Sequence, residues 1–275
     1  VPTSSNDVII PDVTNDPIIT SSSDACHNIT VQSGGVLTSN NGSYKLTTAS
    51  ITVNDGGSLV ISDGEIECTG KADLDGLLTI SGSGATLDIN GELELSSTTT
   101  ESISDGNITV VGDFDGATAN NFTPSGGTLT MDGSGADASI TMHTNANFYN
   151  LTVNSGSYDV DAGSNFDVNG ALKVTSGTLD ISSYTATVSG ATDIDGTLKI
   201  STGIYDANNN FTASGGNITF TDAGFLKCAL SVSSIGTISN SNGTVVYDRQ
   251  SGTQNVTQGT YNNLTIDGNA SHQIG

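Results

Sequence analysis

The chain has 275 residues, and its 29 acidic side chains outnumber its six lysines and arginines to give a formal net charge of −23. This charge repels phosphate backbones and anionic headgroups, so we expect no nucleic-acid partner and no anionic membrane partner. The sequence also lacks an apolar run of about 18 residues, so we expect no membrane-spanning helix.

Residues 1–24 differ in composition from the rest of the chain. They hold three of the four prolines and the apolar runs Val8-Ile9-Ile10 and Ile18-Ile19. We interpret them as an N-terminal entry segment that caps a repeated fold in residues 25–275. The chain opens at Val1 without a signal peptide, which is expected of a processed, secreted product.

Triplets of apolar, polar and apolar residues recur from about Val31 onward, as in Leu151-Thr-Val153 and Leu172-Lys-Val174. This alternation is typical of strands that bury one face. Every third triplet has the same character, so the pattern repeats after about 20 residues and predicts three short strands per coil. We therefore predict an all-β fold, a parallel β-helix or β-solenoid. Its right hand follows from the general preference for right-handed parallel crossovers.

Three inward-facing stacks can be followed through the predicted coils. The first is expected to contain Ile66, Leu87, Ile108, Leu129, Leu151, Leu172, Thr192 and Phe211. The second is expected to contain Tyr158, Leu179, Leu198 and Ile218, and the third Phe166, Ala186, Tyr205 and Phe225. Irregular loops are expected near 96–107 and 115–127, where clean triplets are missing. Cys68 occupies an apolar position, which predicts a buried free thiol, and a disulfide to Cys26 would require the entry segment to fold back.

A longer repeat overlies the short one. Gly127-Thr-Leu-Thr-Met-Asp and Asn150-Leu-Thr-Val recur as Gly243-Thr-Val-Val-Tyr-Asp and Asn263-Leu-Thr-Ile, at offsets of 113 to 116 residues. With the opening segment Val1–Pro11, these Asn-Leu-Thr-(Val/Ile) units resemble the secreted surface repeat proteins of Bacteroidetes-type bacteria. The resemblance implies a β-solenoid exported to the cell surface, with roles in adhesion, matrix or large appendages, and it supplies no catalytic motif.

The motif Asp-x-Asp-Gly occurs three times, each time beside a glycine turn. The carboxylates are Asp73 and Asp75, Asp113 and Asp115, and Asp193 and Asp195. Paired carboxylates present the hard oxygen ligands that Ca²⁺ prefers, so these six are candidate calcium ligands. None of the three motifs continues into an EF-hand loop or a nonapeptide calcium repeat, and solvated turn aspartates are the simpler interpretation. We expect no other cofactor.

The sequence offers little support for catalysis. A β-helical polysaccharide lyase needs clustered cationic groups, yet Arg249 is the sole arginine and the lysines are scattered. A hydrolase needs converging carboxylates. Outward acids are expected in adjacent coils at Glu67 and Asp88 and at Asp159 and Asp180, but so acidic a chain also places such pairs together by chance. The three histidines lie far apart in the sequence, and there is no Gly-x-Ser-x-Gly motif. We expect the protein not to be an enzyme.

We therefore predict an extracellular structural or adhesive module at the cell surface. No distinct cap is visible before Gly275, which favours neighbouring copies stacked end to end as partners in a surface fibre or matrix. Surface glycans or matrix are further candidate partners. The alternatives are a carbohydrate-binding adhesin module and a β-helical polysaccharide lyase or hydrolase.

Overall fold

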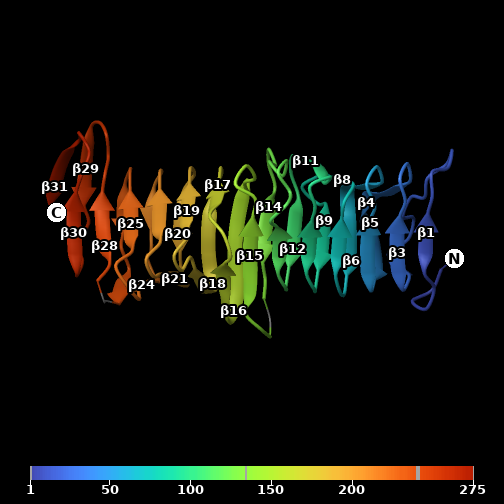
Figure 1. The fold of residues 1–275 in the computed structure, drawn as a ribbon, viewed down its shortest axis with the longest axis horizontal. Helices are drawn as coiled ribbons and strands as arrows, with labels where there is room; N and C mark the ends of the chain where they lie inside the picture. The colour runs from blue at the N-terminus through green and yellow to red at the C-terminus, as the bar shows by residue number, and fades with distance from the viewer. Residues whose placement is uncertain (1, 134, 240–241, 275) are drawn as a thin grey trace. The chain divides into compact units, whose positions relative to one another are not determined.

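The structure is a computed structural model that describes residues 2–133, 135–239 and 242–274. Within these ranges every regular element is a β-strand, and parallel strands stack into a β-solenoid of about 13 turns (Figure 1). This confirms the predicted fold class. No helix that could cross a membrane occurs in these ranges. The coils form two compact units, Val1–Asp132 with Ser139–Tyr149, and Gly133–Ala138 with Asn150–Gly275.

Unit 1 is built from three parallel ladders, because each coil has three sides and contributes a strand to each ladder in turn. The first ladder contains β1 (Val8–Ile10), β3 (Asn28–Val31), β5 (Ser50–Val53), β7 (Ala72–Leu74), β10 (Leu93–Leu95), β13 (Phe114–Gly116) and β15 (Ala138–Met142). The second contains the first parts of β4 (Val36–Thr48) and β6 (Ser58–Cys68), then β8 (Leu77–Ile80) and β11 (Thr100–Ile103). The third contains β2 (Asp24–Ala25), the second parts of β4 and β6, β9 (Thr86–Ile89), β12 (Asn107–Val110) and β14 (Thr128–Met131).

Unit 2 repeats this plan. Its first ladder contains the first parts of β16 (Asn150–Ala162) and β18 (Leu172–Asp180), then β20 (Thr192–Ile194), β23 (Phe211–Thr212) and β26 (Val232–Ser234). The second contains the second parts of β16 and β18, β21 (Thr197–Ile200), β24 (Asn217–Phe220) and β27 (Thr237–Ser239). The third contains β17 (Phe166–Val168), β19 (Thr185–Val188), β22 (Ile204–Ala207), β25 (Phe225–Cys228), β28 (Thr244–Tyr247) and β30 (Asn263–Ile266). A separate pair joins β29 (Thr253–Val256) to β31 (Ser271–Ile274).

The core of each unit consists of the inward residues of successive coils. In unit 1, Ile66, Leu87, Ile108 and Leu129 pair in the predicted register, and all four are buried. In unit 2, Leu151, Leu172, Thr192 and Phe211 do the same. The hydroxyl of Thr192 satisfies its buried polarity with the Tyr205 hydroxyl at 3.0 Å. Cys26, Cys68 and Cys228 are buried free thiols.

Two predicted inward positions are wrong. Val160, not Tyr158, pairs with Leu179, because β16 carries extra residues just before this point and Tyr158 remains 36% exposed. In the third ladder Leu226 pairs with Tyr205, while Phe225 lies outward and is 38% exposed. The larger apolar side chain of Phe225 favoured the wrong register. Cys228 is buried, and because inward and outward positions alternate along a strand, Leu226 also faces inward.

The segments predicted outside the regular coils contain some strand. Within residues 1–24, β1 pairs with β3, and Ile18 forms an isolated bridge with Thr38, so this part of the chain traces the first coil. Within 96–107, β11 pairs with β8. Residues 117–127 contain no strand, and there Phe122 packs against Phe114 with ring centroids 5.7 Å apart.

Ser182 is the non-glycine residue with a left-handed backbone in the described chain, at a φ of 50°. Its N–H donates to Asp180 Oδ1 at 2.7 Å, a bond that glycine retains. We expect Ser182→Gly to raise the free energy of unfolding by about 0.5–1 kcal/mol, because relief of the left-handed strain exceeds glycine's entropy cost. Urea denaturation measures this. Ser183→Gly is the matched control, since that residue has no strain to relieve and should lose stability.

Candidate functional site

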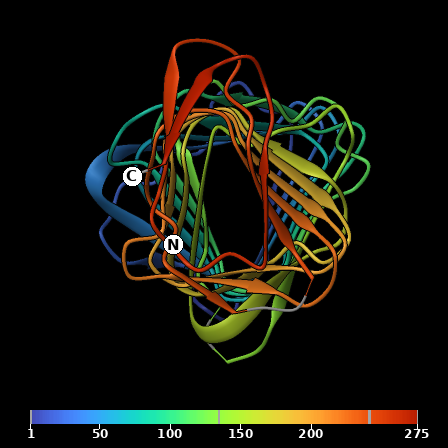
Figure 2. The ribbon, with the colours of Figure 1, turned by 90° about the vertical axis from the view of Figure 1, so that its left-hand side faces the viewer.

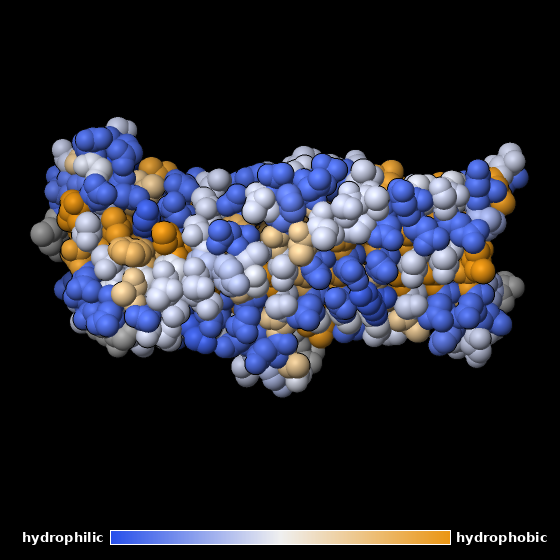
Figure 3. Space-filling model, viewed as in Figure 1, coloured by the Kyte–Doolittle hydropathy of each residue, from blue (hydrophilic) through white to orange (hydrophobic). Residues whose placement is uncertain are grey.

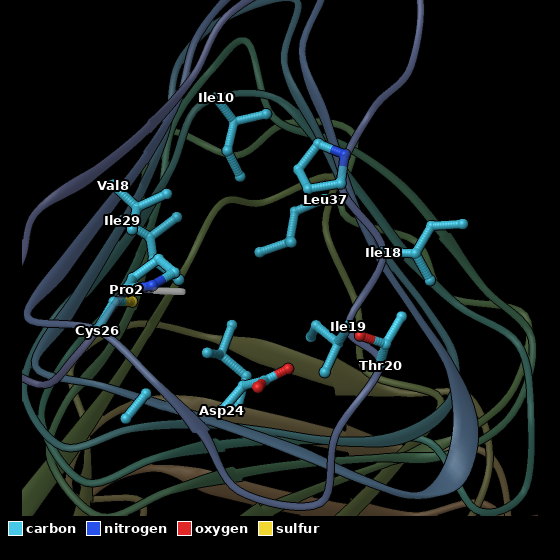
Figure 4. A pocket seen from close by; sticks show the side chains of 13 residues that line it. Pro2, Val8, Ile10, Ile18, Ile19, Thr20, Asp24, Cys26, Ile29 and Leu37 are labelled. Atoms are coloured by element: carbon cyan, nitrogen blue, oxygen red, sulfur yellow. The ribbon is translucent and has the colours of Figure 1, made fainter.

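The first coil of unit 1 ends in an apolar cavity, which we call the mouth. Its volume is about 270 Å³, and β1, β2 and residues 17–20 contribute to its wall. The side chains of Ile10, Ile19 and Leu37 reach into it from different sides of the coil (Figure 4). In the interior of unit 1 such side chains are covered by the next coil. In the described chain the mouth is therefore the end of the hydrophobic core of unit 1, where Ile10, Ile19 and Leu37 line a cavity although each is only 4% exposed.

Strand β1 is also an uncovered edge. In the described chain it pairs only with β3, through the register Val8↔Ile29 and Ile10↔Val31. An unpaired strand edge presents free N–H and C=O groups to a further strand. Ile9 on this strand is 62% exposed and Ile18, near the mouth, is 52% exposed. The rim of the mouth thus combines apolar side chains with backbone hydrogen-bonding groups.

The polar groups of the mouth do not form a catalytic arrangement. Asp24 and Thr20 contribute the polar side chains of the lining. Burial raises the pKa of the Cys26 thiol, so the reactive thiolate is disfavoured at neutral pH. Outside the mouth, His27 Nδ1 lies 3.0 Å from Asp7 Oδ1, and its hydrogen bond lowers the pKa of that carboxyl. The mouth is suited to packing rather than to proton transfer.

A second uncovered core surface lies on β30 in unit 2. This strand pairs only with β28 in the described chain. Leu264 and Ile266 occupy the inward positions, in register with Val245 and Tyr247, yet they are 41% and 46% exposed. The face of the molecule in Figure 3 is mostly hydrophilic along the strands, with apolar residues at the surface near β1 and near β28–β30.

The six candidate calcium ligands do not converge on one point. Asp73 is half-buried on β7, and burial, followed by the charges of Asp75 and Glu94, raises the pKa of its carboxyl. No group of three or more metal-ligating side chains found in the described residues includes any of the six. Each Asp-x-Asp pair therefore offers a calcium ion only two side-chain carboxylates, far fewer than the six to eight oxygens that it prefers.

Three carboxylates of the other two pairs contact groups of the protein itself. Asp113 Oδ1 accepts hydrogen bonds from the backbone N–H and the hydroxyl of Ser139, at 2.7 and 2.9 Å. Asp115 Oδ1 accepts from the N–H of Ala117 at 3.0 Å, which is a local turn contact. Asp193 lies 3.2 Å from Lys173 Nζ, and Asp195 is exposed.

A different acidic cluster lies on unit 2, and it adds Asp161 to Asp159 and Asp180, which the sequence predicted as outward acids of adjacent coils. One carboxylate oxygen from each of Asp159, Asp161 and Asp180 lies within 4.8 Å of the others. Lys199 Nζ is 2.6 Å from Asp180 and 3.6 Å from Asp159, so a lysine already supplies positive charge. Burial and then the charges of Asp180 and Asp159 raise the pKa of Asp161. Asp161 was missed because the sequence placed Asp159 beside Asp180, whereas the register of β16 pairs Asp161 with Asp180.

Lysines bridge neighbouring coils elsewhere as well. Lys45 Nζ lies 2.7 Å from Glu65 and 3.1 Å from Glu67 on the next coil. Lys71 pairs in the same way with Glu92 and Glu94. Since these side chains are partly exposed, each pair adds little stability alone, and their main effect is to offset repulsion along the ladders.

We expect calcium to have little effect on this protein. Addition of millimolar CaCl₂ should shift the unfolding temperature no more than the same ionic strength of NaCl, because the carboxylate group found in the described residues has only three members. Differential scanning calorimetry in the two salts and in chelator measures this. A calcium-specific increase that is lost in an Asp73→Asn, Asp75→Asn variant would contradict the expectation.

Comparison with known proteins gives one match. Residues 1–112 match the model of the G8 domain, which is less than half of the 275-residue chain. No curated protein and no solved structure matches the chain significantly. The matched residues lie entirely in unit 1 and include the mouth.

Proposed function

We propose that the protein is an extracellular structural module whose exposed core surfaces add further β-coils, so that copies join end to end into a surface fibre or matrix. The observation that carries the proposal is the mouth with its unpaired edge strand β1. The G8-domain match and the β-solenoid fold are both compatible with an extracellular module. The resemblance to secreted bacterial repeat proteins supports the same placement.

A second copy fits the mouth because β30 resembles the strand that β1 already binds. β3 reads Asn-Ile-Thr-Val and pairs with β1 in parallel, while β30 reads Asn-Leu-Thr-Ile. β30 of one copy would thus present Leu264 and Ile266 to the unpaired edge of β1 in the next. Such a contact joins two different surfaces, so it does not close and it propagates.

Analytical ultracentrifugation and electron microscopy over a wide concentration range test this assembly. We expect end-to-end oligomers of the protein, and monomers for Ile9→Lys, because a lysine on an exposed edge strand opposes pairing. Thr109→Lys, at an outward position within a ladder, is the control that should still assemble. A wild-type protein that remains monomeric at every concentration would refute end-to-end joining.

The extracellular placement has a separate test. Protease treatment of intact cells that produce the protein should degrade it, while a cytoplasmic marker survives. Protection of the protein in intact cells, with degradation after lysis, would refute the placement.

The proposal assigns no catalysis to the chain. The ion pairs between lysines and carboxylates and the apolar lining of the mouth support this assignment.

A further inference from the structure

Each unit has a strand that extrudes a four-residue loop where it passes from one ladder to the next, β4 in unit 1 and β16 in unit 2. In unit 1 the register passes from Asn40↔Asp63 to Lys45↔Glu65, so residues 41–44 lie opposite Gly64 alone. In unit 2 the register passes from Asn154↔Ser176 to Asp159↔Thr178, so residues 155–158 lie opposite Gly177 alone. The two glycines have φ values of 82° and 77°. We call residues 41–44 and 155–158 the tyrosine loops.

The tyrosine loops share their sequence although their flanks differ. The first reads Asn-Gly-Ser-Tyr and the second Ser-Gly-Ser-Tyr, 114 residues later, and an asparagine precedes each. The following residue is Lys45 in one unit and Asp159 in the other. A bulge requires a turn residue such as glycine, but it does not require a tyrosine. The repeated tyrosine therefore calls for an explanation other than the turn.

The loops present their tyrosines at the surface. Tyr158 is 36% exposed and Tyr44 is half-buried. In Figure 2, β4 (blue) and β16 (yellow-green) each run wide of the neighbouring coils. Within the first loop, Asn41 Oδ1 accepts from the N–H of Ser43 at 2.9 Å, and the second loop is held by Ser155 Oγ, which donates to the Tyr158 carbonyl at 2.8 Å. The loops are therefore shaped before any ligand arrives.

One lysine beside each loop offsets part of the negative charge of the carboxylates around it. Lys45 is paired with Glu65 and Glu67, and Asp159 lies near Lys199. What each loop offers a ligand is an amphipathic ring flanked by exposed polar residues, Asn41 and Ser43 in the first loop and Ser157 in the second. Tyrosine, serine, glycine and asparagine also dominate adaptable recognition loops in other proteins. This chemistry fits an uncharged ligand that has both hydroxyls and an apolar face.

We propose that Tyr44 and Tyr158 each stack on a sugar ring, and that the tyrosine loops are two binding sites for neutral glycans. The C–H groups on one face of a pyranose pack on the phenol ring, while neighbouring asparagine and serine groups hydrogen-bond the hydroxyls. Acidic glycans are disfavoured, because the chain carries a net charge of −23. The proposal is independent of end-to-end assembly, since neither loop lies on β1 or β30.

An array of immobilised neutral and acidic oligosaccharides tests the proposal. We expect the wild-type protein to bind neutral glycans. Titration of the best neutral oligosaccharide should give two sites per chain, one site in Tyr44→Ala or Tyr158→Ala, and at least tenfold weaker binding in the double variant. Tyr→Phe at both positions should retain most of the affinity, because the ring remains.

Tyr149→Ala is the matched control, since Tyr149 is 38% exposed but lies outside both loops. Unchanged unfolding temperatures would show that the loop variants are folded, as expected for substitutions outside the core. Binding to no neutral glycan, binding to acidic glycans alone, or full binding by the folded double variant would overturn the proposal.

Discussion

Leu198→Ala should lower the free energy of unfolding by about 2–5 kcal/mol, the usual cost of removing a large aliphatic side chain from a packed core. Leu198 is 0% exposed on β21 and stacks between Leu179 and Ile218 of the adjacent coils. No other part of the chain can fill the cavity that the substitution leaves, because each coil contacts only its neighbours. Urea denaturation followed by circular dichroism measures the loss.

Thr197→Ala is the matched control in the same strand. Thr197 faces outward and is partly exposed, so its loss should cost less than about 1 kcal/mol through weaker strand propensity. An equal loss from the two substitutions would mean that β21 does not alternate inward and outward as described. It would also remove the basis for assigning the stacks of unit 2.

Acidification from pH 7 to about pH 4.5 should raise the unfolding temperature. Asp73, Asp88 and Asp161 all have pKa values raised first by burial and then by neighbouring carboxylates. A carboxyl whose folded pKa exceeds its unfolded value binds protons more readily in the native state, so stability rises as the pH falls through the folded pKa. The gain is complete near the unfolded value of about 3.9.

The opposite sign applies to Glu67, whose pKa is lowered by its hydrogen bond with Lys45. The stability from this pair is present above the unfolded pKa of glutamate, about 4.3, and it is lost as the pH falls through the lower folded value. We therefore expect the unfolding temperature to pass through a maximum at acid pH rather than to rise continuously as the pH falls. Salt at pH 7 should also stabilise the protein by screening its negative charges.

Calorimetry between pH 3 and pH 8, at low and high NaCl, checks this behaviour. The salt effect should shrink at about pH 4.5, where fewer carboxylates are ionised. An unfolding temperature that falls steadily from pH 7 downward would show that the lysine bridges outweigh the repulsion among the aspartates. Asp161→Asn should reproduce part of the acid stabilisation at pH 7.

The sequence predicted the fold and most of the stacks because a solenoid is governed by local patterns. Ile66, Leu87, Ile108 and Leu129 recur at nearly constant spacing, and that spacing is enough to place them in register. The register of Tyr158 was wrong because the loop in β16 shifts the paired residue by two, to Val160. The register of Phe225 was wrong by one residue, which exchanges the inward and outward sides of the strand. No pattern in the triplets shows how long each corner is.

The candidate sites were predicted less well for a related reason. The Asp-x-Asp-Gly motifs are contiguous and easy to see, yet their carboxylates contact different partners. Asp159, Asp161 and Asp180 come together across adjacent strands, which requires the register to be known. Residues 1–24 were predicted to cap the coils, and the cavity that they line was not predicted, because it depends on how the side chains of the first coil pack.

By itself, the sequence determined that this chain is a parallel β-solenoid with aliphatic stacks inside, because alternation and a near-constant repeat leave the apolar residues no other common face. Tertiary structure alone decided which residues the corners expose. Gly64 and Gly177 each turn a corner with one residue where β4 and β16 use four, and this difference extrudes Tyr44 and Tyr158. Corner length is a property of two paired coils, and neither strand encodes it alone.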